Sequence, residues 1–224
     1  MRQSVRFFLS DRLIELSSLD SNMTLLDFLR EEQRRCGTKE GCAEGDCGAC
    51  TVVLVECNDG ELSCKAVNSC IVFIASLDGK QVLTVEDLKS SDGVLHPVQQ
   101  AMVDLHGSQC GFCTPGFIMS LFALYYSEEN PSFKSINDAL IGNLCRCTGY
   151  RPILDAARAA VDTRPSHYWD QAMLDIKSRL ERLRDGVDVE LVQTNGNYFI
   201  PRNLSTLLRL KAEYPNSFLL AGGT

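Results

Sequence analysis

Short runs in which hydrophobic and polar residues alternate occupy the first part of the chain. Alternation of this kind places the hydrophobic side chains on one face of a strand, and turn residues divide the runs into pairs. Ser10-Asp11 separates the first pair, and Asn58-Asp59-Gly60 separates the second, which is typical of a hairpin. The predicted strands are residues 5–9, 12–16, 51–57 and 62–67, with further strand in residues 71–88.

One segment among these strands has helical spacing instead. Residues 21–33 present their leucines and phenylalanine on one side, with Thr24 as the predicted N-cap and Asp27 three positions later, as in a capping box. A few strands covered by a single helix predict a small α+β domain, which we place at residues 1–88.

From about Gly93 the hydrophobic spacing is that of helices. A helix, a cysteine pair and a second helix opened by proline occur twice in this order, which predicts two helical hairpins packed as a four-helix unit. We expect Gly107 to end one helix, Thr114 to cap the next and Pro115 to be its first residue. The predicted helices are residues 96–107, 114–130, 135–144 and 151–161, in a domain of residues 89–163.

The pattern weakens after Val161. Residues 164–200 are predicted to be a linker that contains a mostly exposed helix. Residues 201–224 are predicted to form a helix, a buried strand and a glycine turn. Because one helix and one strand do not make a domain, we expect this last segment to begin a further domain of a longer protein.

Composition narrows the range of functions. The 224 residues can form more than one hydrophobic core, and no apolar run approaches the roughly 18 residues that span a bilayer. The net charge of -7, without a long basic run, argues against nucleic-acid binding. The N-terminus lacks the apolar core of a signal peptide, so we expect a cytoplasmic protein with neither a membrane nor a nucleic acid as its partner.

The chain contains eleven cysteines, and most of them are grouped at short spacings. In a reducing compartment, cysteines grouped in this way bind metal more often than they form disulfides. Cys42, Cys47 and Cys50 lie in a glycine-rich loop with the C-x4-C-x2-C spacing of plant-type [2Fe–2S] ferredoxins. Structural zinc sites use paired knuckles instead, so this group predicts an iron–sulfur cluster.

The fourth ligand of this cluster can be selected from the geometry of the predicted hairpin. If the hairpin turns at the asparagine, aspartate and glycine, residue 50 lies opposite about residue 67 or 68, and Cys70 falls beside the loop. Cys64 would lie roughly 10 Å further along the strand, and Cys57 would lie at the turn. Cys70 is therefore the predicted ligand. The thiols interpreted as structural are Cys36, Cys57 and Cys64.

A second group is formed by two pairs in the helical part, Cys110 with Cys113 and Cys145 with Cys147. A single C-x-x-C is weak evidence, but packing of the two repeated units would bring four thiolates to one site. Each pair precedes a helix whose free amides favour an anionic cluster. Zinc remains an alternative here. A neighbouring ferredoxin-like cluster favours a second [2Fe–2S] cluster, because two clusters together make an electron path.

Four motifs in this order and spacing resemble the iron–sulfur part of the xanthine dehydrogenase/aldehyde oxidase family of molybdenum hydroxylases. The motifs are GTKEGCAEGDCGACTVV, NSC, GSQCGFCTPGF and LCRCTGYRPI, and the resemblance covers residues 1 to about 163. Within the family the chain most resembles the small subunit of bacterial xanthine dehydrogenase. The resemblance implies an α+β chain with a plant-type β-grasp ferredoxin domain, an all-α [2Fe–2S] domain and the beginning of an FAD-binding domain.

The resemblance also implies an electron route. In this family a partner subunit binds molybdopterin and hydroxylates a purine with oxygen from water, in complexes expected to be of the (αβ)2 type. Electrons would pass to the cluster of the helical domain, then to the ferredoxin-like cluster, then to FAD and NAD. Gln109 would hydrogen-bond the pterin. The residues that would approach the flavin are Leu219, Leu220, Ala221, Gly222, Gly223 and Thr224.

No substrate-converting residue is identified in this chain. His96, His106 and His167 are interpreted as helix-end or surface residues rather than catalysts. Two other readings remain. One is the equivalent subunit of another molybdenum hydroxylase, acting on aldehydes, N-heterocycles or carbon monoxide. The other is a zinc-stabilised interaction module without a redox role.

Overall fold

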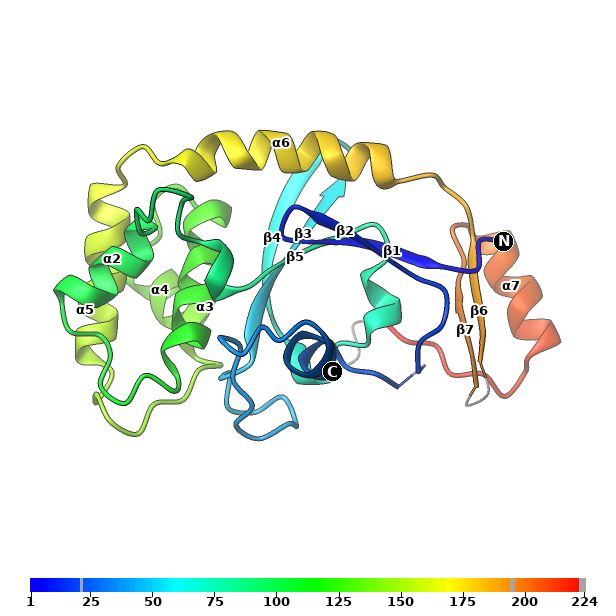
Figure 1. Ribbon diagram of the computed structural model, residues 1–224, viewed down its shortest axis with the longest axis horizontal. Coiled ribbons are helices and arrows are strands. Elements are labelled where there is room, and N and C mark those ends of the chain that lie inside the picture. The colour runs from blue at the N-terminus through cyan, green and yellow to red at the C-terminus, as the bar shows by residue number, and fades with distance from the viewer. Residues whose placement is uncertain (21, 194–195, 222–224) are drawn as a thin grey trace.

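The computed structural model describes residues 1–20, 22–193 and 196–221. A mixed β-sheet lies at the centre of the molecule, a group of helices lies at one end, and a small hairpin with one helix lies at the other (Figure 1). The predicted fold class is confirmed: a sheet-containing domain comes first, and a helical domain follows it in the chain.

The central sheet has five strands in the order β2-β1-β5-β3-β4. Strands β1 and β5 run parallel, and the other neighbours are antiparallel. Val5, Phe7 and Leu9 of β1 alternate with less buried residues, so the pattern that predicted this strand also places its core face. The strands are β1 (Val5–Leu9), β2 (Arg12–Leu16), β3 (Thr51–Asn58), β4 (Glu61–Asn68) and β5 (Gln81–Leu83).

The predicted helix of residues 21–33 is divided into two parts. A single α-helical turn, α1 (Leu25–Asp27), continues as the π-helix η1 (Phe28–Glu32). Thr24 caps the first turn as predicted, because its side chain accepts from the backbone N–H of Asp27. Leu25, Phe28 and Leu29 are buried against the sheet, as expected for a β-grasp domain, whereas Leu26 is buried with Cys50 and Cys70.

Only a small part of residues 71–88 is strand, which corrects the sequence-based expectation. Short 3-10 helices and turns make up the rest of this segment, and only β5 pairs in the five-stranded sheet. Residues 72–77 are buried beneath α1, where the N–H of Leu25 donates to the carbonyl of Val72. Burial by packing and burial by strand pairing require the same apolar residues, so the pattern alone did not distinguish them. The 3-10 helices are η2 (Ser69–Ile71), η3 (Ile74–Leu77) and η4 (Val85–Asp87).

The four predicted helices of the second domain are present. Helix α2 packs on α5, and α3 packs on both α4 and the strands β3 and β4. Every residue from Gly116 to Tyr125 is buried because α3 is enclosed in this way. The helices are α2 (Pro97–Asp104), α3 (Thr114–Ser127), α4 (Phe133–Leu140) and α5 (Arg151–Thr163).

Two predicted helix ends are shifted by one residue. Cys113 is the N-cap of α3, so Thr114 is its first residue and Pro115 its second. After α2 the left-handed residue is His106, with φ of 56°, and Gly107 follows it, donating its N–H to the carbonyl of Met102. Gly107 still has a steric role, because an added Cβ would lie 2.6 Å from the sulfur of Met102.

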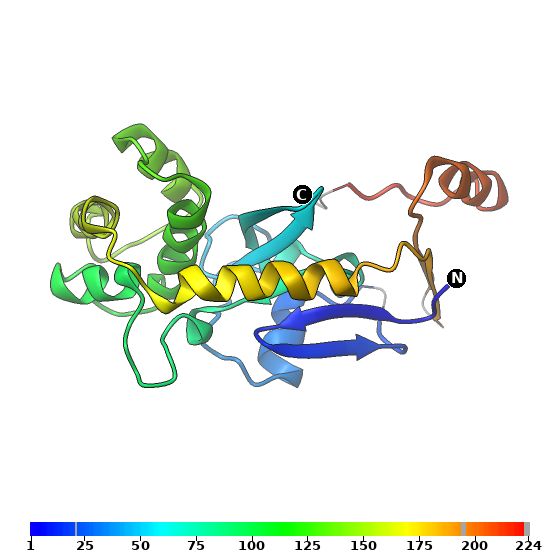
Figure 2. The ribbon, with the colours of Figure 1, turned by 90° about the horizontal axis from the view of Figure 1, so that it is seen from above.

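Residues 164–200, predicted as a linker, contain regular structure that is packed on the rest of the molecule. Helix α6 (Tyr168–Leu183) crosses above the sheet from the helical domain, as Figures 1 and 2 show. The helix is largely exposed, as predicted, but Trp169, Met173, Ile176 and Leu180 form a buried stripe along it. The indole of Trp169 donates to the carbonyl of Leu88, which ties α6 to the end of the first domain.

The hairpin of β6 (Val189–Gln193) and β7 (Gly196–Ile200) was not predicted. It is joined to the N-terminus, where the N–H of Arg2 donates to the carbonyl of Asp188. Asp78, whose side chain is 2% exposed, forms salt bridges with both Arg2 and Arg202. The start of the last segment is therefore attached to the sheet domain by a buried carboxylate.

Helix α7 (Leu204–Glu213) lies within the helix predicted after residue 201. The buried strand expected after it is absent from the described residues. Phe218 is 99% exposed and Leu219 is 68% exposed, so no described part of the chain covers them. An apolar run becomes a buried strand only where other elements cover it. The glycine turn, Gly222 to Thr224, lies outside the described residues.

Candidate functional site: two groups of four cysteines

The first group of cysteines is positioned by the β3–β4 hairpin and the loop before it. Thr51 pairs with Asn68, so Cys50 lies opposite Ser69, one or two residues beyond the predicted position. Cys70 follows in η2, and its sulfur lies 3.4 Å from that of Cys50. The hairpin thus brings Cys70 to the loop, as its predicted geometry required.

Backbone amides of the glycine-rich loop point at the sulfur atoms. The N–H groups of Asp46 and Cys47 donate to the Cys42 sulfur at 3.3 and 3.4 Å, and the N–H of Gly45 donates to the Cys70 sulfur at 3.2 Å. Gly45 has a φ of 83°, a conformation that a side chain would strain. The loop is therefore shaped to stabilise negative charge on sulfur.

The thiols of this group have different proton affinities. Hydrogen bonds from backbone amides, that of Glu44 first, lower the pKa of Cys42 to about 7. Burial raises the pKa of Cys70 to about 12. Cys42 is thus the thiol of the group that the loop most readily holds as a thiolate, which is the form that binds metal.

The second group is built from two loops of the helical domain. Cys110 and Cys113 lie between α2 and α3, and Cys145 and Cys147 lie between α4 and α5. Besides the N–H of Phe112, the thiol of Cys147 lowers the pKa of Cys110, and besides burial, the thiol of Cys145 raises the pKa of Cys113, so each of these thiols has a neighbour on the other loop. Each such pair takes one thiol from each loop, so the site exists only when the two hairpins pack together.

Hydroxyl and amide donors surround Cys145. The hydroxyl of Thr148 lies 3.1 Å from its sulfur, and the backbone N–H of Thr148 donates to the sulfur at 3.5 Å. Burial raises the pKa of Cys145, but these hydrogen bonds outweigh burial, and the net shift is downward. Burial also raises the pKa of Cys113, here to about 12. Tyr150 holds the loop in place by accepting the N–H of Cys145 at its hydroxyl, at 2.9 Å.

The donor set fits a [2Fe–2S] cluster at each site. Such a cluster takes four thiolates, two on each iron. Two thiolates bound tetrahedrally at about 2.3 Å from one metal lie roughly 3.8 Å apart, and the close pair of Cys50 and Cys70 approaches this separation. Among residues 1–20, 22–193 and 196–221, no three histidine, cysteine or acidic side chains gather at one ion-sized position. The sulfurs of Cys50 and Cys70 lie 3.4 Å apart, and the pKa values of Cys42, Cys110 and Cys113 each respond to a second thiol of the same site.

The two groups are in direct contact through the backbone. The N–H of Leu144, which precedes Cys145, donates to the carbonyl of Cys47 at 3.0 Å. Phe112, from the other loop of the helical site, approaches Gly41: a Cβ added at Gly41 would lie 3.7 Å from its ring and only 2.6 Å from the Cys47 sulfur. Two four-thiol sites thus lie next to each other across the domain boundary.

The other predicted site residues lie on the surface. Gln109 is exposed beside Cys110. Leu219, Leu220 and Ala221 are exposed, whereas Gly222, Gly223 and Thr224 lie outside the described residues. Their roles toward a pterin and a flavin therefore stay predictions.

Three cysteines remain outside both groups. Cys57 is buried and Cys64 is half-buried, paired in the β3–β4 hairpin with Leu62 and Val55, and Cys36 is exposed. The three histidines lie at helix ends, as predicted: His96 and His167 accept backbone N–H groups at the starts of α2 and α6, and His106 follows α2.

Sequence reasoning missed two residues that support the cysteine sites. Thr148 donates to a cysteine sulfur, and the carboxamide of Asn143 joins the two cysteine loops. Their position next to the C-x-C pair was the available signal. It was insufficient, because a polar residue beside a cysteine is most often simply solvated.

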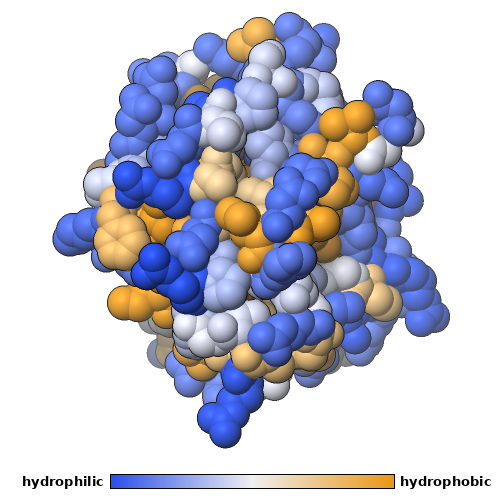
Figure 3. Space-filling view, turned by 90° about the vertical axis from the view of Figure 1, so that its left-hand side faces the viewer, coloured by the Kyte–Doolittle hydropathy of each residue, from blue (hydrophilic) through white to orange (hydrophobic). Residues whose placement is uncertain are grey.

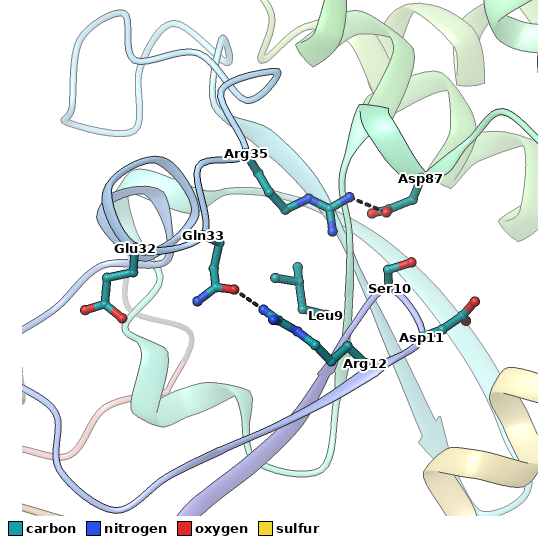
Figure 4. Close-up of a pocket in the computed structure, with 8 residues that line it drawn as sticks. All are labelled: Leu9, Ser10, Asp11, Arg12, Glu32, Gln33, Arg35 and Asp87. Atoms are coloured by element: carbon teal, nitrogen blue, oxygen red, sulfur yellow. Dashed lines mark hydrogen bonds and ion pairs between the residues drawn. The ribbon is translucent and has the colours of Figure 1, made fainter.

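One cavity lies away from both groups. It has a volume of about 560 Å³ and opens beside the β1–β2 turn. Both of its arginines have partners in the lining, Arg35 in a salt bridge with Asp87 and Arg12 in a hydrogen bond with Gln33 (Figure 4). No cysteine lines it. In the part of the chain that the structure describes, no helix is both long and apolar enough to cross a membrane.

Both cysteine groups lie within known families of domains. Residues 8–75 match the 2Fe-2S iron-sulfur cluster binding domain, and residues 84–158 match the [2Fe-2S] binding domain. The first match includes Cys42, Cys47, Cys50 and Cys70, and the second includes the four cysteines of the helical site.

Named proteins resemble this chain over the same region. The xanthine dehydrogenase of Drosophila pseudoobscura pseudoobscura is 49% identical over 151 residues, which are 66% of this chain and 11% of that protein. The structure of the aldehyde oxidoreductase from Desulfovibrio gigas has a TM-score of 0.63 and 33% identity, over 79% of this chain and 18% of that one. This chain therefore spans only a small part of the length of either protein.

A third protein is matched over nearly its whole chain. The quinoline 2-oxidoreductase from Pseudomonas putida 86 has a TM-score of 0.60 and 31% identity, over 71% of this chain and 94% of that chain. This chain has two [2Fe–2S]-binding domains in succession, and the three proteins named here are all oxidoreductases. The chain belongs to the xanthine dehydrogenase/aldehyde oxidase family of molybdenum hydroxylases, and comprises its two iron–sulfur domains.

Proposed function

We propose that this chain is the electron-transfer subunit of a xanthine dehydrogenase. In this role it accepts electrons from the molybdenum centre of a partner subunit, during oxidation of hypoxanthine and xanthine to urate, and delivers them to FAD and NAD. The observation that carries the proposal is the contact between the two four-thiol sites, where the N–H of Leu144 donates to the carbonyl of Cys47. Two neighbouring redox sites joined by a short backbone link suit electron transfer and have no role in an interaction module.

Eight cysteines are assigned to the two clusters. The chemistry that [2Fe–2S] clusters supply is one-electron transfer, at potentials set by hydrogen bonds to sulfur and by exposure to solvent. The protein supplies those hydrogen bonds from Gly45, Asp46 and Thr148, and its helical hairpins keep the thiols of the second site together. The ligands would be Cys42, Cys47, Cys50 and Cys70 at one site, and Cys110, Cys113, Cys145 and Cys147 at the other.

The segment after the helical domain supports the xanthine dehydrogenase assignment over related activities. Residues 164–200 pack on the sheet domain through α6, the salt bridge between Arg202 and Asp78 attaches the next segment, and α7 follows. The match to quinoline 2-oxidoreductase covers 71% of this chain and already uses 94% of that chain. Little of the quinoline 2-oxidoreductase chain is therefore left to correspond to such a segment. The segment would lead into a flavin domain, in which residues 219–224 approach the FAD. The alternative is the equivalent subunit of an enzyme that oxidises aldehydes or N-heterocycles.

Apolar side chains beside the cysteine loops support a partner subunit. Ile141 is 83% exposed, Leu144 is 55% exposed and Phe112 is 48% exposed. The end of the molecule formed by the helical domain carries hydrophobic areas among hydrophilic ones (Figure 3). A molybdopterin-binding subunit would cover these residues and bring its cofactor to Gln109, in a complex of the (αβ)2 type.

Substrate turnover tests the proposed function. The complete complex, purified with its partner subunit, is supplied with NAD and with xanthine, an aldehyde or a quinoline in turn. Reduction of NAD with xanthine, and much slower reduction with the other two, is the expected result. Failure to reduce NAD with xanthine, together with rapid oxidation of an aldehyde or quinoline, would show that the alternative is correct.

A further inference from the structure

The carboxamide of Asn143 lies between the two cysteine loops and has a partner on each side. Its Oδ1 accepts from the hydroxyl of Ser120 on α3, at 2.6 Å. Its Nδ2 donates to the carbonyl of Gly48 at 3.0 Å and lies 3.2 Å from the hydroxyl of Thr51. Asn143 and Ser120 are each 4% exposed, so these hydrogen bonds are made away from water.

The carbonyl of Gly48 is a point of close contact between the two domains. It accepts from the N–H and the hydroxyl of Thr51, at 3.2 and 2.7 Å, as well as from Asn143. A Cβ added at Gly116, in the first turn of α3, would lie 2.2 Å from this oxygen. A Cβ at Gly48 itself would lie 2.2 Å from the carbonyl oxygen of Gly142. Glycine is therefore required on both sides, and the backbones are in contact.

The sequence positions of these atoms connect the contact to the cysteines. Gly48 follows Cys47 and lies two residues before Cys50, and Asn143 lies two residues before Cys145. Asn143 and its neighbour Leu144 hold adjacent carbonyls of the ferredoxin-like loop, those of Gly48 and Cys47. A shift of the carboxamide would move both loops relative to each other.

We infer that Asn143 is a positioning residue that sets the separation of the two clusters. This inference rests on the proposed function, because it takes the eight cysteines as cluster ligands. Electron transfer between two centres falls steeply with their separation, so a fixed contact between the loops keeps transfer fast. An aspartate at this position can accept from Ser120 but, when ionised, cannot donate to Gly48, and it would place an oxygen against the carbonyl there.

The experiment compares the intact protein, with its clusters, in three forms: wild type, Asn143→Asp and Asn143→Ala. The matched control is Asn137→Asp, because Asn137 lies on α4 and donates only to the carbonyl of Phe133 in its own helix. Iron and sulfide contents are measured first. The magnetic interaction between the two reduced clusters is then measured by EPR, as the splitting and the relaxation enhancement of each signal by the other cluster.

The inference predicts full iron content and a reduced or lost interaction in both Asn143 variants, with the wild-type interaction in Asn137→Asp. A wild-type interaction in either fully loaded Asn143 variant would overturn it. Failure of both Asn143 variants to incorporate clusters would also overturn it, since the carboxamide would then be required for folding rather than for spacing. A wild-type protein without two clusters would instead refute the proposed function, and the iron content reveals this before any variant is compared.

Discussion

The guanidinium of Arg164 lies over the ring of Tyr125, 4.4 Å from its centroid. The same guanidinium donates to the backbone carbonyls of Tyr125, in the last turn of α3, and of Glu128 and Glu129, just after it. A residue that follows α5 therefore caps the buried helix α3 and supplies positive charge at the negative end of its dipole.

We predict that Arg164→Ala lowers the free energy of unfolding of the protein by about 1–3 kcal/mol, because several charge-assisted hydrogen bonds and a cation–π contact are lost together. Arg164→Lys should retain only part of the lost free energy of unfolding, since an ammonium group cannot reproduce the planar set of N–H donors of a guanidinium. The control is Arg158→Ala, whose exposed salt bridge with Asp162 contributes little. Denaturant titration measures all three variants, and equal losses in Arg164→Ala and Arg158→Ala would contradict the prediction.

The second prediction concerns pH and His96. The ring of His96 is fully buried, accepts the N–H of Val98 at Nδ1 and lies 5.1 Å from the ring of His167, centroid to centroid. Burial, assisted by the charge of His167, lowers the pKa of His96 to about 3. An unfolded histidine has a pKa of about 6.5, so below this pH the unfolded chain binds a proton that the folded chain excludes.

Stability from His96 is therefore complete above pH 6.5 and is lost as the pH falls toward 3, at about 1.4 kcal/mol per pH unit. His96→Asn removes the titration and keeps an N-cap acceptor. The measurement is the difference in free energy of unfolding between this variant and wild type at pH 7.5, 6.5 and 5.5. The wild type should lose stability relative to the variant mostly in the lowest interval, and a difference that does not change with pH would refute this account.

The third prediction separates cluster ligands from structural thiols. Cys70→Ser is expected to lose roughly half of the iron and the ferredoxin-like EPR signal, because one of two [2Fe–2S] clusters is affected. Cys64→Ser is the matched control in the same hairpin, because the half-buried Cys64 pairs with Val55, further along the strands from the cysteine loop. Loss of iron in Cys64→Ser with full iron in Cys70→Ser would show that the fourth ligand was chosen wrongly.

The fourth prediction concerns the partner surface. Ile141→Asp places a charge on a residue that is 83% exposed and lies four positions before Cys145, where the partner is proposed to dock. We expect weaker association of the subunits, with both EPR signals retained. In analytical ultracentrifugation the variant complex should dissociate at a higher protein concentration than the wild-type complex. Phe133→Asp is the control, because Phe133 is 58% exposed at the opposite end of α4. Equal dissociation in both variants would argue against docking at the cysteine loops.

The grouping of cysteines could be predicted because it depends only on the position of a turn, the spacing of residues along a strand and a repeated sequence pattern. Cys70 was selected from strand spacing and a turn, and an error of one or two residues in the register did not change the choice. The helical site followed from a repeated pattern in sequence. In both cases local rules were sufficient to bring the thiols together, although iron binding by them stays a prediction.

Features that depend on tertiary contacts could not be predicted in this way. The stripe from Trp169 to Leu180 resembled a solvated helix because only one residue in three or four is buried. The run of residues 72–77 resembled strand because packing under α1 requires the same apolar residues. The role of Asn143 depends on the carbonyl of Gly48, which is 95 residues away in sequence. A pattern of neighbouring residues cannot predict a contact between such distant positions.

The central claim is that the chain holds two [2Fe–2S] clusters on these eight cysteines. The most direct test is the content of iron, acid-labile sulfide and zinc per chain in anaerobically purified protein, with EPR after reduction by dithionite. The account predicts about four iron and four sulfide and two distinct signals, as two such clusters require. Zinc in place of iron at either site, or one signal with half of the iron, would contradict it.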